Sequence, residues 1–336
     1  MSNNTIKTSA NLLVNKIFST NISQNFENIA LEIFRFQYSQ NSVYREYVNY
    51  LGFSADDISN IEDIPFLPVE FFKTHKIILD NLEPEIAFLS SSTTGSTPSR
   101  HYVFDTNIYK KSFVKAFQYF FGKPEDFCFL ALLPSYIERE GSSLIYMINE
   151  LMKLSNHQAN GYYLNEYDEI IEKINILKSQ KQKFILFGVT YALLDFAELL
   201  NSEIEPGIVM ETGGMKGKRK ELSKPEIHEL LKKGLKTNQI YSEYGMTELL
   251  SQAYSFGNNL FQCPPWMKVL IRDTYDPFNY IENGTTGGIN LIDLANIYSC
   301  SFIETKDLGK LHQNGQFEVL GRFDNSDIRG CNLLVD

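Results

Sequence analysis

Long hydrophobic runs are missing from this sequence. No stretch of the 336 residues approaches the ~20 apolar residues that a membrane-spanning helix needs. The first eighteen residues contain no continuous apolar segment of the kind found in secretion signals. We therefore expect a cytoplasmic protein without a membrane span.

Cysteine is scarce, and its spacing argues against a Cys-x-x-Cys protein and against a cysteine-ligated metal site. The chain has four cysteines, Cys128, Cys263, Cys300 and Cys331, without a Cys-x-x-Cys pair and without the spacing of metal ligands. Such cysteines are typical of reduced thiols in a cytosolic protein. Cys128, Cys263 and Cys300 lie in apolar or proline-flanked segments, so we expect them in the core.

Positive charge is also in short supply. The chain has 31 basic and 41 acidic side chains, which gives a net charge of −10, and its longest basic cluster is KGKRK at residues 216–220. A nucleic-acid groove needs a basic face, so the composition argues against nucleic-acid binding. A nucleotide substrate remains compatible with it, because magnesium and loop amides can neutralise phosphates locally.

The N-terminal part of the chain has the apolar spacing of helices. Ile29, Ile33, Phe34 and Phe36 follow a period close to 3.6 residues, and Gly52 can end the helix. The segment DIPFLPVEFFKTHKI at residues 63–77 contains two prolines that stop a helix and favour an extended path. We expect residues 1–80 to form a helical region packed on the core.

From residue 85 onward, short apolar runs alternate with amphipathic stretches, which predicts a mainly parallel sheet with helices on both faces. We assign residues 81–265 to this α/β core. The predicted strands are 85–90, 127–134, 183–190, 207–214 and 238–245, and the predicted helices are 112–122, 143–155, 169–180, 193–201 and 223–234.

After Trp266 the helical pattern disappears. Residues 267–273, 287–294, 300–311 and 316–323 are short alternating segments separated by Gly and Asn turns. We expect residues 266–336 to form a small β-rich subdomain with a hinge-like tail. The fold class predicted for the whole chain is therefore α/β.

Five motifs carry polar groups suited to a nucleotide. The first is SSSTTGSTPSRHYVFD, residues 90–105, where eight hydroxyl side chains and Gly95 directly follow the apolar run IAFL. At the carboxyl edge of a sheet, such a loop can bind an anion through its amides and hydroxyls. It lacks the lysine and the GK[ST] ending of a Walker loop. A solvated Ser/Thr loop is an equally good interpretation of this segment alone.

The second motif is YSEYGMTE, residues 241–248. Tyr244 offers an aromatic face for a base, Thr247 a hydroxyl, and Glu248 a carboxylate suited to magnesium, which is usually held by one or two carboxylates plus substrate phosphates. The alternative is a strand end followed by a helix-capping Thr and Glu.

Three further motifs follow along the chain. In METGGMKG the adjacent Gly213 and Gly214 allow close approach of the backbone to a flat ring. In ETKDLG, Asp307 can accept hydrogen bonds from ribose hydroxyls, and in LGRFDNSDIRG, Arg322 can contact a phosphate or ribose. Taken singly, the glycine pair and the Asp-Leu-Gly segment are more often turns.

The order of these motifs resembles the adenylate-forming superfamily of acyl-CoA ligases and luciferases. Within it, IPFLPVEFFKTHKI, SSSTTG, METGGMKG and RGCNLL resemble the acyl-protein synthetases, the fatty-acid-activating subunits of bacterial bioluminescence fatty acid reductases. The resemblance covers roughly residues 25–336. It implies the large-domain fold of the superfamily without the full mobile C-terminal domain, because the chain ends shortly after GRFD.

The resemblance implies that a carboxylate, here a fatty acid, attacks the α-phosphate of ATP to give an acyl-adenylate and pyrophosphate. Thr247 would contact the α-phosphate and Glu248 the Mg²⁺ ion. Asp307 and Arg322 would bind the ribose. The other implied nucleotide-binding residues are Ser91, Ser92, Thr93, Thr94, Gly95, Ser96 and Thr97 at the pyrophosphate, Gly213, Gly214 and Tyr244 at the adenine, and Gly245 next to Tyr244.

The resemblance also implies an acyl acceptor within the chain. Family members transfer the acyl group to a cysteine near their C-terminus, and Cys331 in RGCNLLVD matches that position. A thiolate is the reactive form, and Arg329 can help to lower the pKa of this thiol. The alternative is a small buried side chain. An acyl-reductase or another acyl-acceptor protein is the expected partner.

Two departures from the superfamily pattern bear on these roles. Ser92 replaces the usual glycine before TTG, and the loop has no lysine, so amides, the metal ion or Arg100 must neutralise the phosphates. The rival functions are a carboxylate ligase that uses coenzyme A or a carrier protein, and a non-catalytic acyl- or nucleotide-binding subunit. A Rossmann enzyme is disfavoured because no GxGxxG follows a predicted strand.

Overall fold

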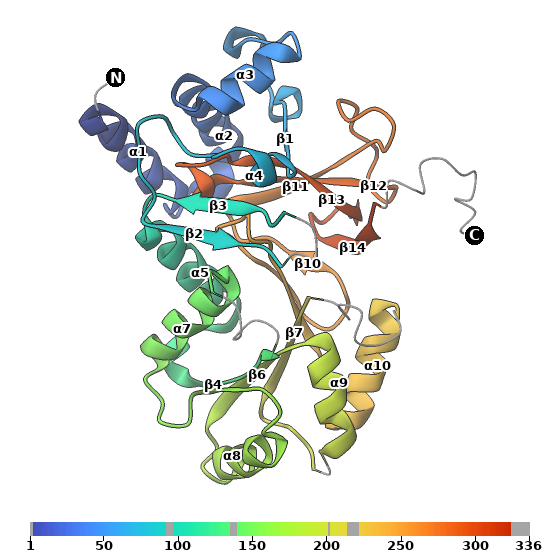
Figure 1. Cartoon of the computed structure of the whole chain (residues 1–336). Coiled ribbons are helices and arrows are strands. Elements are labelled where there is room, and N and C mark those ends of the chain that lie inside the picture. Colours follow the sequence, from blue (N-terminus) through green and yellow to red (C-terminus); the bar gives the residue numbers. More distant parts are fainter. Residues whose placement is uncertain (1–2, 92–96, 135–139, 201, 214–221, 324–336) are drawn as a thin grey trace.

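The computed structural model of the chain describes residues 3–91, 97–134, 140–200, 202–213 and 222–323 (Figure 1). Three helices form its N-terminal part: α1 (Asn3–Ile17), α2 (Ile22–Gln40) and α3 (Ser42–Tyr50). The predicted continuous helix up to Gly52 is wrong at Asn41. The Asn41 side chain accepts a hydrogen bond from the Tyr44 amide (3.1 Å) and donates one to the Ser299 carbonyl (3.0 Å). Asparagine at this position caps a new helix instead of continuing the old one.

The proline-containing segment leads from these helices into the C-terminal sheet. Strand β1 (Leu67–Pro68) pairs in parallel with β13 (Phe302–Leu311), with Leu67 opposite Ile303. The path is extended, as predicted, except for the one-turn helix α4 (Phe71–Thr74) and the 3₁₀ turns η1 (Ala55–Asp57) and η2 (Ile61–Asp63).

A parallel sheet forms the centre of the molecule, in the order β8-β7-β6-β4-β5. Helices cover both faces: α5 and α7 lie on one side, and α9 and α10 on the other (Figure 1). This confirms the α/β prediction. The strands are β4 (Phe127–Leu132), β5 (Gly161–Tyr163), β6 (Lys183–Val189), β7 (Ile208–Thr212) and β8 (Tyr241–Tyr244). The helices are α5 (Thr106–Phe121), η3 (Pro124–Asp126), α7 (Ser143–Ser155), α8 (Tyr167–Ser179), α9 (Thr190–Leu199) and α10 (Lys224–Leu235).

The sheet continues into antiparallel strands at its β8 end. β14 (Phe317–Arg322) pairs with β10 (Phe261–Gln262) through one residue pair, Phe261 opposite Phe317, and this pair joins the two halves of the sheet. The remaining elements are β9 (Ala253–Ser255), β11 (Met267–Arg272), β12 (Thr286–Asp293) and the 3₁₀ turn η4 (Leu294–Asn296).

The expectation that the hydroxyl-rich loop follows a strand of the parallel sheet is wrong. β2 (Ile86–Leu89) pairs only with β3 (Arg100–Val103), in a separate antiparallel two-stranded sheet, and the loop connects the two. The apolar run IAFL has one fully buried residue, Phe88, which suits a ribbon lying over the core. A short apolar run in a sequence does not reveal which sheet it joins.

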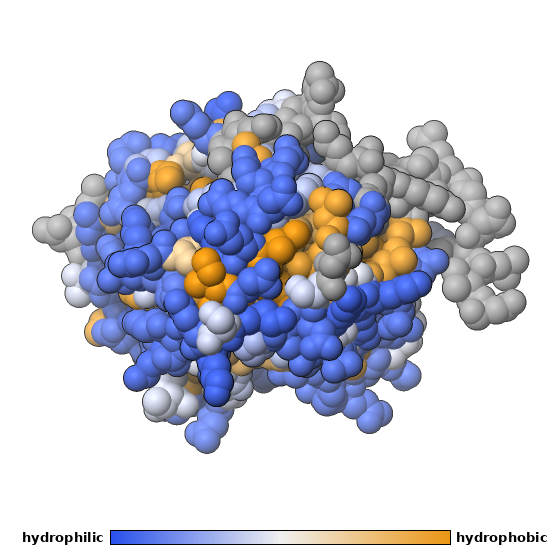
Figure 2. Space-filling model, turned by 90° about the horizontal axis from the view of Figure 1, so that it is seen from below, coloured by the Kyte–Doolittle hydropathy of each residue, from blue (hydrophilic) through white to orange (hydrophobic). Residues whose placement is uncertain are grey.

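The core runs through the whole molecule and is rich in aromatic side chains, among them Phe34, Tyr44, Phe113, Phe196 and Phe302. The surface seen from below in Figure 2 is mostly hydrophilic, with hydrophobic residues gathered in a band near its centre. In the described part of the chain, no helix has the length and hydrophobicity needed to cross a membrane.

Candidate functional site

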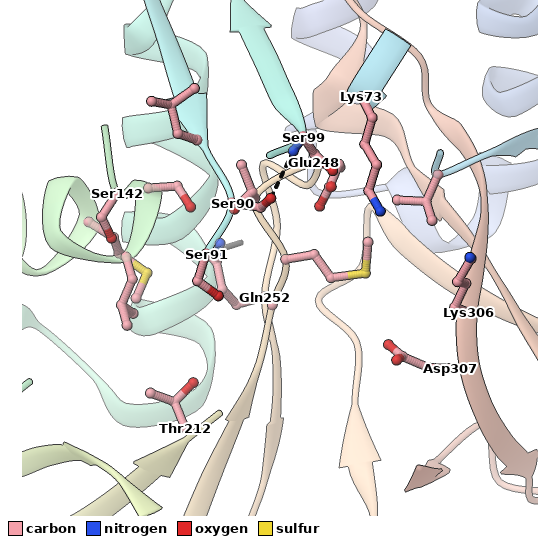
Figure 3. A pocket seen from close by; sticks show the side chains of 18 of the residues that line it. Lys73, Ser90, Ser91, Ser99, Ser142, Thr212, Glu248, Gln252, Lys306 and Asp307 are labelled. Carbon is pink, nitrogen blue, oxygen red and sulfur yellow. Dashed lines mark hydrogen bonds between the residues drawn. The ribbon is translucent and has the colours of Figure 1, made fainter. Parts of the chain in front are cut away.

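A cavity of about 280 Å³ opens where the parallel sheet, the β2–β3 ribbon and the β13–β14 hairpin meet (Figure 3). It lies at the carboxyl ends of β7 and β8, where ligands bind in open α/β sheets. Seven residues predicted from the sequence line it together, although they come from four separate segments. They are Ser91, Thr97, Gly245, Thr247, Glu248, Asp307 and Arg322.

Glu248 is the buried carboxylate of this cavity, with 5% of its surface exposed. Burial raises the pKa of Glu248, while a hydrogen bond from the Ser99 hydroxyl and the charge of Arg322 act against that rise. The site thus holds a carboxyl group whose charge is costly unless a cation arrives next to it.

Two buried side chains hold the backbone around Glu248 in place. Nδ1 of His101 donates to the Thr247 carbonyl (2.8 Å), and Nδ2 of Asn296 donates to the Glu248 carbonyl (2.7 Å). Burial lowers the pKa of His101 to about 4, so the ring is neutral at pH 7. His101 came from the sequence only as a histidine next to a motif, whereas the structure makes it a positioning residue.

Asp307 connects the YGMTE and GRFD motifs. The Tyr244 hydroxyl donates to Oδ2 of Asp307 (2.7 Å), and Nε of Arg322 donates to Oδ1 (3.2 Å). The Tyr244 ring is held by edge contacts with Phe261 and Phe317, at centroid distances of 5.8 and 5.6 Å. Each oxygen of Asp307 has a second lone pair for a ligand donor.

Two lysines that the sequence analysis did not single out also line the cavity. Lys73 lies in the last turn of α4, and Lys306 precedes Asp307 on β13. Both lie across the cavity from Ser90 and Ser91 (Figure 3). Lys306 forms an ion pair with Glu70. Arg100, the cation expected to neutralise phosphates, is not among the lining residues. The signal that could have identified Lys73 was its place in EFFKTHK, which belongs to the family-like segment.

The two faces of the β7–β8 pair carry different carboxyl groups. Glu211 lies opposite Ser242, and Thr212 opposite Glu243, so alternation places Glu211 and Glu243 on opposite faces of the sheet. On the helix α10 side, Lys224 contacts Glu211 at 2.5 Å. Burial alone would raise the pKa of Glu211, but the charge of Lys224 and hydrogen bonds from His228 and Ser242 lower it to about 2.

Glu243 faces the cavity and forms no ion pair with a basic side chain among the described residues. Thr212 donates a hydrogen bond to its Oε2, and burial raises the pKa of Glu243 to about 7. The sequence analysis quoted Glu243 within YSEYGMTE and assigned it no role. Its proton equilibrium is set by burial between β7 and β9, which sequence spacing does not reveal.

Magnesium fits this site only together with a phosphate ligand. Among the residues the structure describes, no cluster of three His, Cys, Asp or Glu side chains could hold a metal ion alone. Glu248 provides one buried carboxylate, and Mg²⁺ commonly uses one or two carboxylates plus substrate phosphates and water.

Several predicted site residues stand apart from the cavity lining. Gly213 follows β7 with a φ of +72°, and the Thr190 hydroxyl donates to its carbonyl (3.2 Å). A positive φ of this size favours glycine, which accounts for the residue type there. Ser92, Thr93, Thr94, Gly95, Ser96, Gly214 and Cys331 lie outside the described residues.

Cys128 and Cys300 lie in the core, as the sequence predicted, whereas Cys263 is only partly buried against it. Cys128 and Cys300 have no exposed surface, and burial raises the pKa of each thiol to about 12. Cys263 is half-buried, and its pKa is raised as well. Thiols with such pKa values are largely protonated at pH 7 and are poor nucleophiles.

The fold resembles that of solved adenylate-forming ligases. A 2-hydroxyisobutyryl-CoA ligase, solved in an open conformation with 2-HIB-AMP and CoA, is 13% identical over 89% of this chain and 70% of that chain, with a TM-score of 0.66. ATP-bound MatB from Rhodopseudomonas palustris is 16% identical over 70% of this chain and 47% of that chain, with a TM-score of 0.52. The chain therefore spans about half the length of MatB.

The chain belongs to the acyl-protein synthetase family LuxE, whose sequence profile matches residues 17–336. No curated protein sequence matches the chain significantly.

Proposed function

We propose that this protein activates a carboxylic acid with ATP and transfers the acyl group to a protein thiol. The carrying observation is the convergence of Thr247, Glu248, Asp307 and Arg322 on one cavity in a chain of the acyl-protein synthetase family. In the first step, a carboxylate oxygen forms a bond to the α-phosphorus, and the bond from that phosphorus to pyrophosphate breaks. The products are an acyl-adenylate and pyrophosphate.

The contacts around Asp307 support a nucleotide orientation. Asp307, fixed by Tyr244 and Arg322, would accept hydrogen bonds from the ribose hydroxyls. Tyr244, Gly213 and Gly214 are assigned to the adenine on the family resemblance. Thr247 contacts the α-phosphate, and the 91–97 loop contacts the pyrophosphate portion. Such a reaction depends on alignment and charge neutralisation more than on a protein nucleophile.

Charge neutralisation at the phosphates is assigned to lysines and to a metal ion. Lys73 and Lys306 line the cavity and bring positive charge where the 90–105 loop has no lysine. Glu248 would hold Mg²⁺ together with the phosphates, and the ion would supply further positive charge when bound. The negative charge of Glu248, in the loop after β8, would then be balanced by the bound ion.

The second step needs a thiol, and Cys331 is the proposed acceptor. Its thiolate attacks the acyl carbonyl carbon, a thioester forms, and AMP leaves with the bonding electrons. The raised pKa values of Cys128, Cys263 and Cys300 support this choice by making those thiols poor nucleophiles. An acyl-reductase or another acyl-acceptor protein is proposed to remove the acyl group.

The test is carboxylate-dependent exchange of radioactive pyrophosphate into ATP, followed by a search for acyl label on the chain. A fatty acid is the substrate that the family resemblance implies, so the panel runs from acetate to tetradecanoate and includes substituted acids. If none of these acids supports pyrophosphate exchange, the result contradicts acid activation. Exchange without a hydroxylamine-labile acyl group on the chain would favour coenzyme A or a carrier protein as acceptor.

Cys331→Ser should keep pyrophosphate exchange and lose the hydroxylamine-labile label, since a serine hydroxyl is a weaker nucleophile and gives an ester. Cys300→Ser is the matched control and should keep the label, because Cys300 is buried away from the site. A Cys331→Ser protein that still forms a thioester would place the acceptor elsewhere.

A further inference from the structure

The cavity has a floor of polar side chains below Ser91, formed by the ends of β7, β8 and β9. Thr212 and Gln252 lie there in Figure 3, and Glu243 lines the same region. The Thr212 hydroxyl donates to one oxygen of Glu243. In the part of the chain that the structure describes, no basic side chain forms an ion pair with this carboxyl group, in contrast to Glu211 on the other face.

Gln252 supplies a buried amide with an unused acceptor. Only 3% of its surface is exposed, and its Oε1 atom has no hydrogen-bond partner among the described residues. Buried acceptors without a partner are rare in folded proteins and call for an explanation, such as a missing ligand. Because Gln252 lines the cavity, a bound molecule can provide the donor.

Glu243 and Gln252 approach the same point beside Gly245. A Cβ atom at Gly245 would lie 2.5 Å from Oε1 of Glu243 and 3.4 Å from Cγ of Gln252. The absence of a side chain at residue 245 therefore leaves the Glu243 carboxyl group in place on the floor. The two polar side chains form a pair that one substituent of a ligand can contact.

The α7 side of the cavity is partly aromatic. The Tyr109 hydroxyl donates to the Ser143 carbonyl (3.1 Å), and the Tyr109 ring stacks on Tyr146 with centroids 5.7 Å apart. Ser142 and Met147 of the α7 region complete this side of the cavity. The wall favours carbon atoms, while the floor favours a hydrogen-bonding group.

We infer that the acid activated here carries a hydrogen-bond donor, a hydroxyl or an amino group, on its carbon chain, and that Glu243 and Gln252 bind this group. The inference rests on the proposed acid activation and departs from the unsubstituted fatty acid that the family resemblance implies. An unsubstituted chain on this floor would leave the Gln252 carbonyl unpaired and would bury the Glu243 carboxyl group under methylenes. Sites built to bind a polar group reject analogues that lack it.

The test measures kcat/KM for pyrophosphate exchange with length-matched acids. The panel is butanoate, 3-hydroxybutanoate, 4-hydroxybutanoate, 3-aminobutanoate, 4-aminobutanoate and tetradecanoate. A preference of ten-fold or more for a hydroxy or amino acid over butanoate and tetradecanoate supports the inference, and the preferred arm tells which donor is bound. Equal or better exchange with the unsubstituted acids overturns it and leaves acid activation intact. If none of the six acids supports exchange, both proposals are overturned.

Variants connect the preference to these two residues. Gln252→Leu and Glu243→Leu should reduce the preference to three-fold or less, whereas Glu243→Gln, which keeps a hydrogen-bonding amide, should retain most of it. Gln118→Leu on the exposed face of α5 is the control and should leave the preference unchanged. A preference that survives in both leucine variants would overturn the assignment to Glu243 and Gln252.

Discussion

Glu248 is buried and also lines the ligand cavity, so replacing it should affect both the stability and the activity of the protein. Burial raises its pKa, which means that the folded protein bears a cost when Glu248 is ionised and unpaired. A neutral side chain of the same shape removes that cost. The same replacement removes a charge that the proposed reaction uses, so stability and activity should change in opposite directions.

We therefore expect Glu248→Gln to lower pyrophosphate exchange about 100-fold, which corresponds to about 3 kcal/mol in the transition state, without lowering the denaturation midpoint. Exchange kinetics and urea denaturation measure the two effects. Glu172→Gln, an exposed carboxylate on α8, is the control. An unchanged exchange rate in Glu248→Gln would show that Glu248 only supports the loop.

At the residue scale, the sequence revealed groups that sit in short motifs and carry charge or hydroxyls. Thr247, Glu248, Asp307 and Arg322 were predicted in this way, and the structure brings them to one cavity. Lys73 and Gln252 were not predicted, although Lys73 lies in a family-like segment and Gln252 lies four residues after YSEYGMTE. Their positions on the cavity depend on packing between segments far apart in the chain.

At the element scale, the strands and helices of the α/β core were predictable because their apolar periodicity is long enough to read. Helix α7 begins and ends where the sequence pattern predicted. The two-residue strands β1 and β10 carry no usable periodicity and were missed. The run IAFL was assigned to the wrong sheet, because sheet membership is decided by tertiary packing.

The buried amide of Gln37 links helix α2 to the C-terminal sheet region. Nε2 of Gln37 donates to the carbonyls of Asn296 (2.9 Å) and Ile297 (3.0 Å), and its Oε1 accepts from the Ser301 amide (3.0 Å). Asn296 in turn holds the Glu248 carbonyl. The N-terminal helices thus support the loop that carries Glu248.

Replacing this amide by an apolar side chain should be costly. Gln37→Leu leaves buried backbone groups of Asn296 and Ser301 without partners, so we expect the free energy of unfolding to fall by about 2 to 4 kcal/mol. Urea denaturation measures the loss. Gln24→Leu on the exposed face of the same helix should change it by less than about 0.5 kcal/mol. Equal midpoints for Gln37→Leu and the unmodified protein would contradict the role of Gln37.

At the scale of the whole molecule, four buried groups with large pKa shifts contribute strongly to the pH dependence of stability. Burial raises the pKa of Glu243 to about 7 and of Asp293 to about 6, from ordinary values of 4.5 and 3.8. Burial lowers the pKa of His101 from 6.5 to about 4, and the partners of Glu211 lower its pKa from 4.5 to about 2.

The signs of these shifts predict a maximum of stability near pH 5. Glu243 and Asp293 keep their protons when folded and lose them when unfolded, so their contribution to stability falls as pH rises to about 7. The neutral, buried His101 makes stability rise with pH between about pH 4 and 6.5. The stabilising contribution of ionised Glu211 is lost as pH falls from 4.5 to about 2. The net effect is a loss of about 2 kcal/mol from pH 4.5 to 7.

Urea denaturation between pH 4.5 and 7.5 tests this expectation. Glu243→Gln should flatten the profile, because the remaining contributions of Asp293 and His101 nearly cancel. A decline of the same size in Glu243→Gln would assign the pH dependence to other groups.

The single residue pair between β10 and β14 has a consequence for how the molecule responds to ATP. Phe261 and Phe317 meet at this narrow join, and the ring of Tyr244 packs against both. A nucleotide bound by Tyr244 on one side of the join and by Asp307 on the other would contact both halves of the sheet and stabilise the pairing between them. The backbone amides of residues 261 and 317 should then exchange with deuterium more slowly when ATP is present, while amides in the distant helix α8 exchange at unchanged rates. Equal exchange at the join with and without ATP would show that its opening is independent of the ligand.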